Sequence, residues 1–443
     1  MTRWLYSLLM WLAQPALRRK LARRGLQEAG YLEAVEERFG YYSERATASA
    51  SAPDRSRLDQ PSAGASNTVW LHAVSLGETR AAASLVAALR QGIPGMRLLL
   101  THGTATGRAE GAKLLRPGDL QTWQPWDTPA AAARFLAHFR PRLGILMETE
   151  IWPNLAAACA QAGVPLVLAN ARLSEKSARQ THRLAWLARP AYASLTAVWA
   201  QTQDDALRLT SLGAKVQGVL GNLKFDATPD AAQLASGGVW RQRSAVPIGM
   251  FASSREGEED ALLRLLAADP AASALQWLIV PRHPQRFDAV AALVQSHGFA
   301  LSRRSLWGDG PPGGGAGEPC IWLGDSLGEM ALYYGLADVA LLGGSFEPLG
   351  GQNLIEAAAC ACPVLMGPHT FNFSEAADLA QAAGAALRVA DLAQAVQTAL
   401  ALVHDKPRLQ AARQAADAFA RAHRGATERL ADAIVRLFEG GGR

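Results

Sequence analysis

A carboxylate at the junction of a predicted strand and a predicted helix is the first candidate for chemistry in this chain. In HAVSLGETRAAASL, which begins at His72, Glu78 lies where a small, apolar run gives way to a helical pattern. An acid in the first turn of a helix is stabilised by the helix dipole. A carboxylate at the end of a strand can also serve as a general base. Spacing alone weights these two roles of Glu78 about evenly.

A second acidic segment is METEIWPN, where Glu148 and Glu150 follow the apolar run LGILM. Two acids at the end of a buried strand are costly unless they are solvated, paired or used in chemistry. Lys224, in GNLKFD, lies near the expected junction of two domains and could face either of them. The plainer interpretation of Lys224 is an ordinary solvated lysine. These residues are therefore further candidates for a polar site.

A basic segment in the second half has the character of a phosphate site. In LIVPRHPQRF, Arg282 and His283 come directly after a predicted strand. Arginine presents a forked set of donors that matches phosphate oxygens. The plainer interpretation is a surface arginine beside a structural histidine, His283.

Glycine-rich loops follow two other predicted strands of this half. In LLGGSFEPLGGQNLIEAA, two pairs of glycines precede a helix predicted to begin at Gln352. Glycines permit close backbone approach, and a helix N-terminus offers free N–H groups to an anion. Asn353 and Glu356 share one helical face, where the glutamate could accept hydrogen bonds from ribose hydroxyls. GDSLGEM repeats the order of strand, loop and helix, with Gly328 and Glu329 at the expected helix start.

Length and composition describe a globular chain with more than one core. With 443 residues, 49% hydrophobic and 19% charged, two domains are expected and disorder is not. The net charge of +5 suits an anionic ligand or surface, and no nucleic-acid motif is visible. The four cysteines show no CxxC pair and no metal-ligand spacing, which indicates a reducing compartment.

The N-terminal stretch has the pattern of a helix that lies in a membrane interface. The range Trp4–Leu17 is uncharged and rich in Trp and Leu, and a cluster of five basic residues follows it. The stretch is shorter than the roughly 20 residues that span a bilayer, but apolar residues with a basic flank suit an anionic surface. A buried terminal helix and a short spanning anchor are the alternatives.

Apolar runs alternate with helical patterns along the rest of the chain, which predicts parallel sheets with helices on both faces. The fold class is α/β, with two doubly wound, Rossmann-like domains that face a cleft. We expect a membrane-associating segment at 1–44, a first domain at 68–226 and a second at 240–443. The Ala/Ser-rich segment 45–67 reads as a linker. Ligands should bind at the carboxyl ends of the strands.

At these segments the sequence resembles the 3-deoxy-D-manno-octulosonic acid (Kdo) transferases of lipopolysaccharide assembly. The resemblance is carried by HAVSLGE, METEIWPN, ANARLSEKS, GNLKFD, PRHPQRF, GDSLGE, GGQNLIEAA and GPHTFNF. The N-terminal stretch and VEERFGYY are similar as well. The resemblance covers nearly the whole chain, and its motifs are long and in order.

The resemblance implies a GT-B glycosyltransferase on the cytoplasmic face of a Gram-negative inner membrane. The donor would be CMP-Kdo and the acceptor a tetraacylated lipid A precursor, and transfer would invert the anomeric centre without a metal or cofactor. By motif match, Glu78 would be the general base, and Glu148 and Lys224 would stabilise the transition state. The positions matched to CMP binding are Pro281, Arg282, Leu327, Gly328, Glu329, Asn353, Leu354, Ile355 and Glu356.

Two positions depart from the family pattern. The glycine loop usually reads GGHN and here reads GGQN, so Gln352 can donate a hydrogen bond but cannot carry a charge. In FASSREGEE, Ser254 and Arg255 replace the usual Thr-His, and Arg255 offers a positive charge there. Two other functions remain open at this point: a nucleotide-sugar epimerase of the same fold, and a non-catalytic nucleotide-binding module at a membrane surface.

Overall fold

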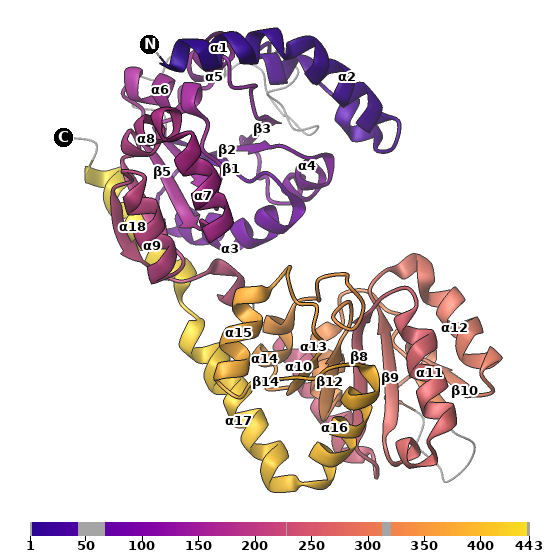
Figure 1. The fold of residues 1–443 in the computed structure, drawn as a ribbon. Helices are drawn as coiled ribbons and strands as arrows, with labels where there is room; N and C mark the ends of the chain where they lie inside the picture. The colour runs from indigo at the N-terminus through magenta and orange to yellow at the C-terminus, as the bar shows by residue number, and fades with distance from the viewer. Residues whose placement is uncertain (1, 43–66, 227, 312–319, 441–443) are drawn as a thin grey trace. The chain divides into compact units, whose positions relative to one another are not determined.

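The computed structural model describes residues 2–42, 67–226, 228–311 and 320–440 (Figure 1). The chain divides into two compact units. Unit 1 consists of Met1–Asp226 with Arg424–Arg443, and unit 2 consists of Ala227–His423. The sequence predicts a first domain that ends at 226 and a second domain at 240–443. The structure instead places residues 424–443 in unit 1 and residues 227–239 in unit 2. Most of the predicted linker lies outside the described residues.

The described part of unit 1 contains a sheet of seven parallel strands in the order β3-β2-β1-β4-β5-β6-β7. The strands are β1 (Thr68–His72), β2 (Arg97–His102), β3 (Leu120–Trp123), β4 (Leu143–Met147), β5 (Leu166–Ala171), β6 (Ala197–Ala200) and β7 (Val216–Val219). All five residues of β1 and of β4 are buried. Their near-continuous apolar runs are typical of central strands covered on both faces.

Helices cover both faces of this sheet. One core joins alternate strand residues to α5 (Pro129–Phe139), α6 (Pro153–Gln161), α7 (Glu175–Arg183), α8 (Ala185–Ala193) and α9 (Gln203–Ser211). The other joins the opposite strand residues to α3 (Leu76–Gly92) and α18 (Ala426–Gly440). The amphipathic α18 buries Leu430, Ile434 and Phe438 here. Asp226, at the end of η5 (Leu223–Asp226), accepts hydrogen bonds from the amides of Gly425 and Thr427 at the start of α18.

The N-terminal segment packs on unit 1. It comprises α1 (Thr2–Leu12), α2 (Gln14–Gly25) and the short helices η1 (Ala29–Leu32) and η2 (Val35–Phe39). Ser7 donates to Asn154 Oδ1 in α6, and Glu37 Oε2 accepts from Arg108 in α4 (Ala105–Ala112) and from the amide of Trp123. Among the described helices, none combines the length and apolar character that crossing a bilayer requires.

The described part of unit 2 repeats the architecture, with the strand order β10-β11-β9-β8-β12-β13-β14. The strands are β8 (Ile248–Ser254), β9 (Gln276–Pro281), β10 (Ala300–Arg303), β11 (Cys320–Leu323), β12 (Val339–Leu342), β13 (Val364–Met366) and β14 (Ala386–Arg388). One face is covered by α11 (Glu258–Ala268), α12 (Phe287–Ser296) and α16 (Leu392–His404). The remaining helices are α10 (Ala231–Arg243), α13 (Met330–Leu336), α14 (Leu354–Ala359), α15 (Ser374–Ala382) and α17 (Lys406–His423), and the short turns are η6 (Pro270–Ala274), η7 (Pro284–Arg286) and η8 (Arg304–Leu306).

The start of unit 2 is helical where the sequence suggested a break. In α10, Gly237 lies against α13 so closely that a Cβ atom there would come within 2.2 Å of the carbonyl oxygen of Leu332. A small residue in this segment therefore allows two helices to approach closely.

Candidate functional site

Glu78 and Glu148 follow the two strands at which the topology of unit 1 reverses. β1 pairs with β4, and the chain proceeds from β1 towards β3 in one direction and from β4 towards β7 in the other. Ligands of open α/β sheets bind beyond the carboxyl ends of the strands at such a switch point. Two of the predicted catalytic residues thus lie at the edge of the sheet where the fold favours binding.

Glu78 is the third residue of α3 and takes part in the start of that helix. Ser75 is the N-cap, and its Oγ accepts a hydrogen bond from the amide of Glu78 at 3.4 Å. The carboxylate in turn accepts from Ser75 Oγ at 3.0 Å and from the amide of Val74 at 2.9 Å. This arrangement is a variant of the capping box. The Ser-x-x-Glu spacing could have revealed it in the sequence.

The pKa of Glu78 is raised to about 7. Burial is the largest cause and the neighbouring carboxylates Glu148 and Glu150 act in the same direction, while the bonds from Val74 and Ser75 oppose the shift. A carboxyl group with this pKa is ionised in part of the molecules near neutral pH and readily accepts a proton. The side chain is only partly buried. Glu78 therefore combines a structural role at the helix start with the properties of a general base.

Glu148 pairs with the predicted cation of this site. Lys224 Nζ lies 3.1 Å from Glu148 Oε1, an ion pair rather than an aligned hydrogen bond. Glu148 has φ = +57°, a left-handed conformation that is uncommon for glutamate and is enriched at functional sites. Both residues belong to unit 1.

A network of amide side chains holds Lys224 near Glu148. Asn170 Oδ1 accepts from the amide of Leu223, and Asn222 Oδ1 accepts from the amide of Lys224 itself. Gln201 links these segments, since it donates to the carbonyl of Asn170 and accepts from Asn222 Nδ2. Asn170 lies near the end of β5, and Gln201 and Asn222 follow β6 and β7. Three further strand ends therefore fix the position of one lysine.

Unit 2 has its own switch point, between β8 and β12. Ser254 is the last residue of β8, and Arg255 follows it. Gly343 and Gly344 follow β12. Arg282 follows β9, which pairs with β8. The basic and glycine-rich segments singled out in the sequence therefore meet at one edge of the second sheet.

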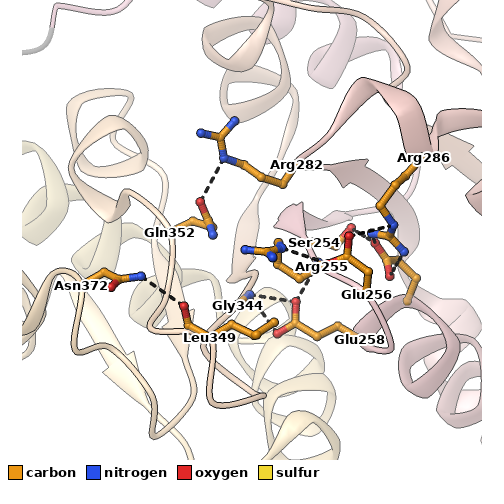
Figure 2. A network of polar contacts seen from close by, with 11 residues as sticks. Ser254, Arg255, Glu256, Glu258, Arg282, Arg286, Gly344, Leu349, Gln352 and Asn372 are labelled. Atoms are coloured by element: carbon orange, nitrogen blue, oxygen red, sulfur yellow. Dashed lines mark hydrogen bonds and ion pairs between the residues drawn. The ribbon is translucent and has the colours of Figure 1, made fainter. Parts of the chain in front are cut away.

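A buried glutamate joins these loops (Figure 2). Glu258 is 1% exposed and accepts hydrogen bonds from the amide of Gly344 at 2.8 and 2.9 Å and from the amide of Arg255 at 2.9 Å. A longer bond comes from the amide of Phe346. Burial raises the pKa of the Glu258 carboxyl against these bonds. In the sequence, Glu258 looks like a solvated acid in the first turn of a helix, and no signal there reveals its burial.

Arg282 and Gln352 meet at the rim of the glycine loop. Arg282 is exposed, and its Nε donates to Gln352 Oε1 at 3.1 Å (Figure 2). The predicted helix start at Gln352 was wrong, because α14 begins at Leu354 with Asn353 as its N-cap. The Asn353 side chain accepts from the amide of Ile355 and donates to Glu356 Oε1 at 3.1 Å. With six residues and a side-chain cap, α14 adds little to an anion site beyond its cap residues.

The remaining predicted donor residues lie around α13. Glu329 Oε1 accepts from Arg304 at 2.8 Å, while Leu327 and Gly328 are exposed. Gly328, Glu356 and residues of α10 and α13 line a cavity of about 300 Å³. Gly328 and Glu356 thus face one hollow although 28 residues separate them in the sequence, and its size is suitable for part of a nucleotide.

Three of the predicted binding residues are core residues in this fold. Pro281, Leu354 and Ile355 are all buried, and the latter two are each 1% exposed. Any contact of Leu354 or Ile355 with a ligand must therefore use the backbone. Glu78, Glu148 and Lys224 gather in unit 1, and the donor positions gather in unit 2. Within the described ranges, no three His, Cys, Asp or Glu side chains come together as a metal site would need.

Comparison with known proteins places these residues in a family context. The sequence model of a family described as 3-Deoxy-D-manno-octulosonic-acid transferase (kdotransferase) matches residues 33–227. A 3-deoxy-D-manno-octulosonic acid transferase of Bordetella pertussis is 46% identical over 448 aligned positions, which cover 98% of this chain and 99% of that protein.

Solved structures share the fold at much lower identity. A glycosyltransferase of Rickettsia africae is 14% identical with a TM-score of 0.51, over 84% of this chain and 98% of that one. The UDP-GlcNAc 2-epimerase of Neisseria meningitidis is also 14% identical with a TM-score of 0.51, over 83% and 98%. Because a transferase and an epimerase match equally well, these similarities concern the fold alone.

Proposed function

This chain belongs to the 3-deoxy-D-manno-octulosonic-acid (Kdo) transferase family of glycosyltransferases, and from that premise we propose that it moves Kdo from CMP-Kdo to a tetraacylated lipid A precursor. Transfer inverts the anomeric centre, and Glu78 is the general base. The observation that carries the assignment of Glu78 is its pKa of about 7 at the carboxyl end of β1. The shift to near-neutral pH suits a group that accepts a proton during the reaction.

In this mechanism a sugar hydroxyl of the acceptor attacks the anomeric carbon of Kdo. Glu78 takes the hydroxyl proton while the new carbon–oxygen bond forms. The bond from the anomeric carbon to the phosphate oxygen breaks at the same time, and CMP leaves with the bonding electrons. The bonds from Val74 and Ser75 hold the carboxylate in one orientation, which supports its use as a positioned base.

The ion pair of Glu148 and Lys224 stabilises charge in the transition state. Its partners are held by a left-handed backbone at Glu148 and by the amide network around Lys224. A fixed pair of opposite charges requires little reorganisation when charge develops nearby. This rigidity supports a catalytic role over that of an ordinary surface lysine.

The sugar nucleotide CMP-Kdo is held by exposed hydrogen-bonding side chains and by the cavity of unit 2. Arg282 binds its phosphate, and the hollow beside Gly328 and Glu356 accepts the nucleoside.

Removing a charged donor from a phosphate costs about 2 kcal/mol. Arg282→Ala should therefore weaken CMP binding by about tenfold or more, measured by calorimetric titration. Unchanged CMP affinity would count against this phosphate site.

Membrane attachment is part of the proposal, because the acceptor is a lipid. Trp4 and Trp11 of α1 are 70% and 62% exposed, which leaves large apolar side chains without a protein partner to cover them. A cationic groove on α2 follows, lined by Arg19, Lys20, Arg23 and Arg24. An apolar helix with a basic neighbour suits the interface of an anionic bilayer. We place the protein on the cytoplasmic side of the inner membrane of a Gram-negative cell.

A transfer assay with mass spectrometry of the lipid tests the reaction. CMP-Kdo and a tetraacylated lipid A precursor should give a lipid heavier by one or more Kdo residues, with CMP released only when the acceptor is present. Release of free sugar without acceptor would instead indicate an epimerase or hydrolase.

Vesicle binding tests the location. Substitution of Arg19, Lys20 and Arg23 by Gln should reduce sedimentation with anionic phospholipid vesicles. The matched control removes three exposed charges from α17, by Lys406, Arg408 and Arg421→Gln, and should bind as the wild type does. Equal binding of all three proteins would exclude α2 as the contact.

A further inference from the structure

Arg255 is a basic residue at the switch point of unit 2 to which no role has yet been given. We propose that Arg255, together with Arg282 and the amide of Gln352, forms an anion site for a phosphate oxygen of the nucleotide donor. When no anion is bound, Glu256 forms an ion pair with Arg255. The inference rests on the proposed function, since it names a further binding residue for the same donor.

The position of Arg255 is set by the fold. It directly follows β8, one of the two strands at which the sheet of unit 2 reverses its order. Ser253, two residues before Arg255, has φ = +54°, which turns the chain at the end of the strand. The amide of Arg255 donates to the buried Glu258, which also binds the amide of Gly344. One buried carboxylate therefore holds the arginine loop and the glycine loop together.

The space between these loops is the second observation. A Cβ atom at Gly344 would lie 3.2 Å from Gln352 Nε2 and 3.5 Å from Arg255 Cγ. Gly344 has φ = +70°, which also favours glycine. The absence of a side chain at Gly344 therefore lets Arg255 and the donor end of the Gln352 amide lie close to the backbone there, and Figure 2 shows both above Gly344.

The ion pair between Arg255 and Glu256 is weak enough for an anion to replace Glu256. Its Nε donates to Glu256 Oε2 at 3.1 Å, and the side chain of Glu256 is 57% exposed. Exposed ion pairs contribute little to stability. Glu256 also lies 3.4 Å from Arg286, so it keeps a cationic partner after it leaves Arg255.

Arg286 provides the contrast within the same network. Its two terminal nitrogens donate to Glu259 at 2.7 and 3.0 Å, and Glu259 is fully buried. Ser254 donates to the same carboxylate at 2.7 Å. A bidentate pair with a buried partner is not available to a ligand. Of the two arginines that contact Glu256, Arg255 is the one free to bind an anion.

The neutral Gln352 fits this distribution of charge. Its carbonyl oxygen accepts from Arg282, which fixes the amide so that its nitrogen lies on the side of Gly344. Arg255 and Arg282 then supply the positive charge, and Gln352 supplies orientation and one further donor. Gln352 is thus a positioning residue for Arg282 as well as a contact for the anion.

Binding of CMP and of cytidine by Arg255→Met tests the inference. The two ligands differ by the phosphate, so loss of a cationic donor should weaken CMP by about tenfold or more and leave cytidine unchanged, both measured by titration. Arg264→Met is the matched control, because it removes an equally charged, 70% exposed side chain from α11. It should bind CMP as the wild type does. Melting temperatures verify that both variants are folded.

A second variant tests the role of Glu256. Glu256→Gln removes the carboxylate that competes with the anion for Arg255, so CMP should bind several-fold more tightly while cytidine binds equally. Unchanged CMP binding by Arg255→Met, or equal weakening of CMP and cytidine, overturns the phosphate assignment. If the wild type catalyses transfer and binds CMP, such a result leaves the proposed function intact. If the wild type binds no CMP, the proposed function fails with it.

Discussion

The first strand of each sheet leads into a helix whose first turn carries a glutamate, and the two glutamates differ in what surrounds them. Glu78 follows β1, is partly exposed and accepts one amide and one hydroxyl bond. Glu258 follows β8, is 1% exposed and accepts from the amides of Arg255, Gly344 and Phe346. Burial raises the pKa of both carboxyl groups.

The difference shows how one local pattern serves two purposes. Three backbone amides from two loops occupy the carboxylate of Glu258, so a proton from a substrate has no access and the group acts as a clamp. Glu78 retains exposed surface and a neighbourhood of other carboxylates, which favours proton uptake. A shifted pKa alone therefore does not identify a catalytic acid; the partners and exposure decide.

The largest expected effect separates the two residues by activity. Glu78→Gln keeps the shape and the bond from Ser75 but removes the basic oxygen, so transfer should fall by about 10²- to 10⁴-fold. The measurement is kcat for lipid product formation. Glu175→Gln is the control, because Glu175 is also an acid in a first helical turn of unit 1, at an exposed position. Near-normal turnover of Glu78→Gln would remove the base assignment.

The second prediction concerns stability, which substitution of Glu258 should lower far more than substitution of Glu78. In Glu258→Gln, one acceptor oxygen must serve three amides, and the new NH₂ group opposes at least one of them. A buried donor left unsatisfied beside a lost charge-assisted bond costs about 3 kcal/mol. Urea denaturation should show this loss, whereas Glu78→Gln should change stability far less at neutral pH. Equal stability of the two variants would mean that Glu258 is not a clamp.

The third prediction is a pH dependence. A general base must be ionised, and the pKa of Glu78 is about 7. The value of kcat/KM should therefore rise by about tenfold from pH 6 to pH 8 and level off above that range. Lys224→Met provides a second profile, because it lowers the rate without removing the base and should keep the rising limb. A flat profile from pH 6 to pH 8 in the wild type would contradict the shifted pKa.

Much of this architecture could be predicted from the sequence. The central strands could be predicted, because their apolar runs are buried on both faces. The strands β3, β10 and β14 lie at sheet edges and are short and partly polar, as in Leu120–Trp123, so they give no such run. The exchange of α18 into unit 1 was missed, since its amphipathic pattern does not indicate which sheet it covers.

Parts of the site resisted prediction for a different reason. The resemblance named Glu78, Glu148 and Lys224, and spacing suggested the anion loops, but the clamp formed by Glu258 depends on amides that lie about 90 residues away. Leu354 and Ile355 were expected at the ligand and lie in the core, because a motif match does not distinguish a contact from the scaffold beneath it. Burial of a polar side chain is a property of tertiary packing.

The smallest expected effect is a pH-dependent difference in stability between Glu78→Gln and the wild type. The folded state raises the pKa of Glu78 from 4.5 to about 7. The stability that the protonated group contributes is therefore lost as the pH rises from 4.5 to about 7, and it does not return above that pH. Gln does not ionise. Glu78→Gln should therefore be equal to or slightly less stable than the wild type at pH 5, where the wild type is protonated and Val74 has its acceptor. At pH 8 it should be more stable by about 1 kcal/mol, allowing for partial solvent screening. Urea denaturation at both values measures the difference, and a constant difference would show that folding leaves the pKa of Glu78 near its ordinary value.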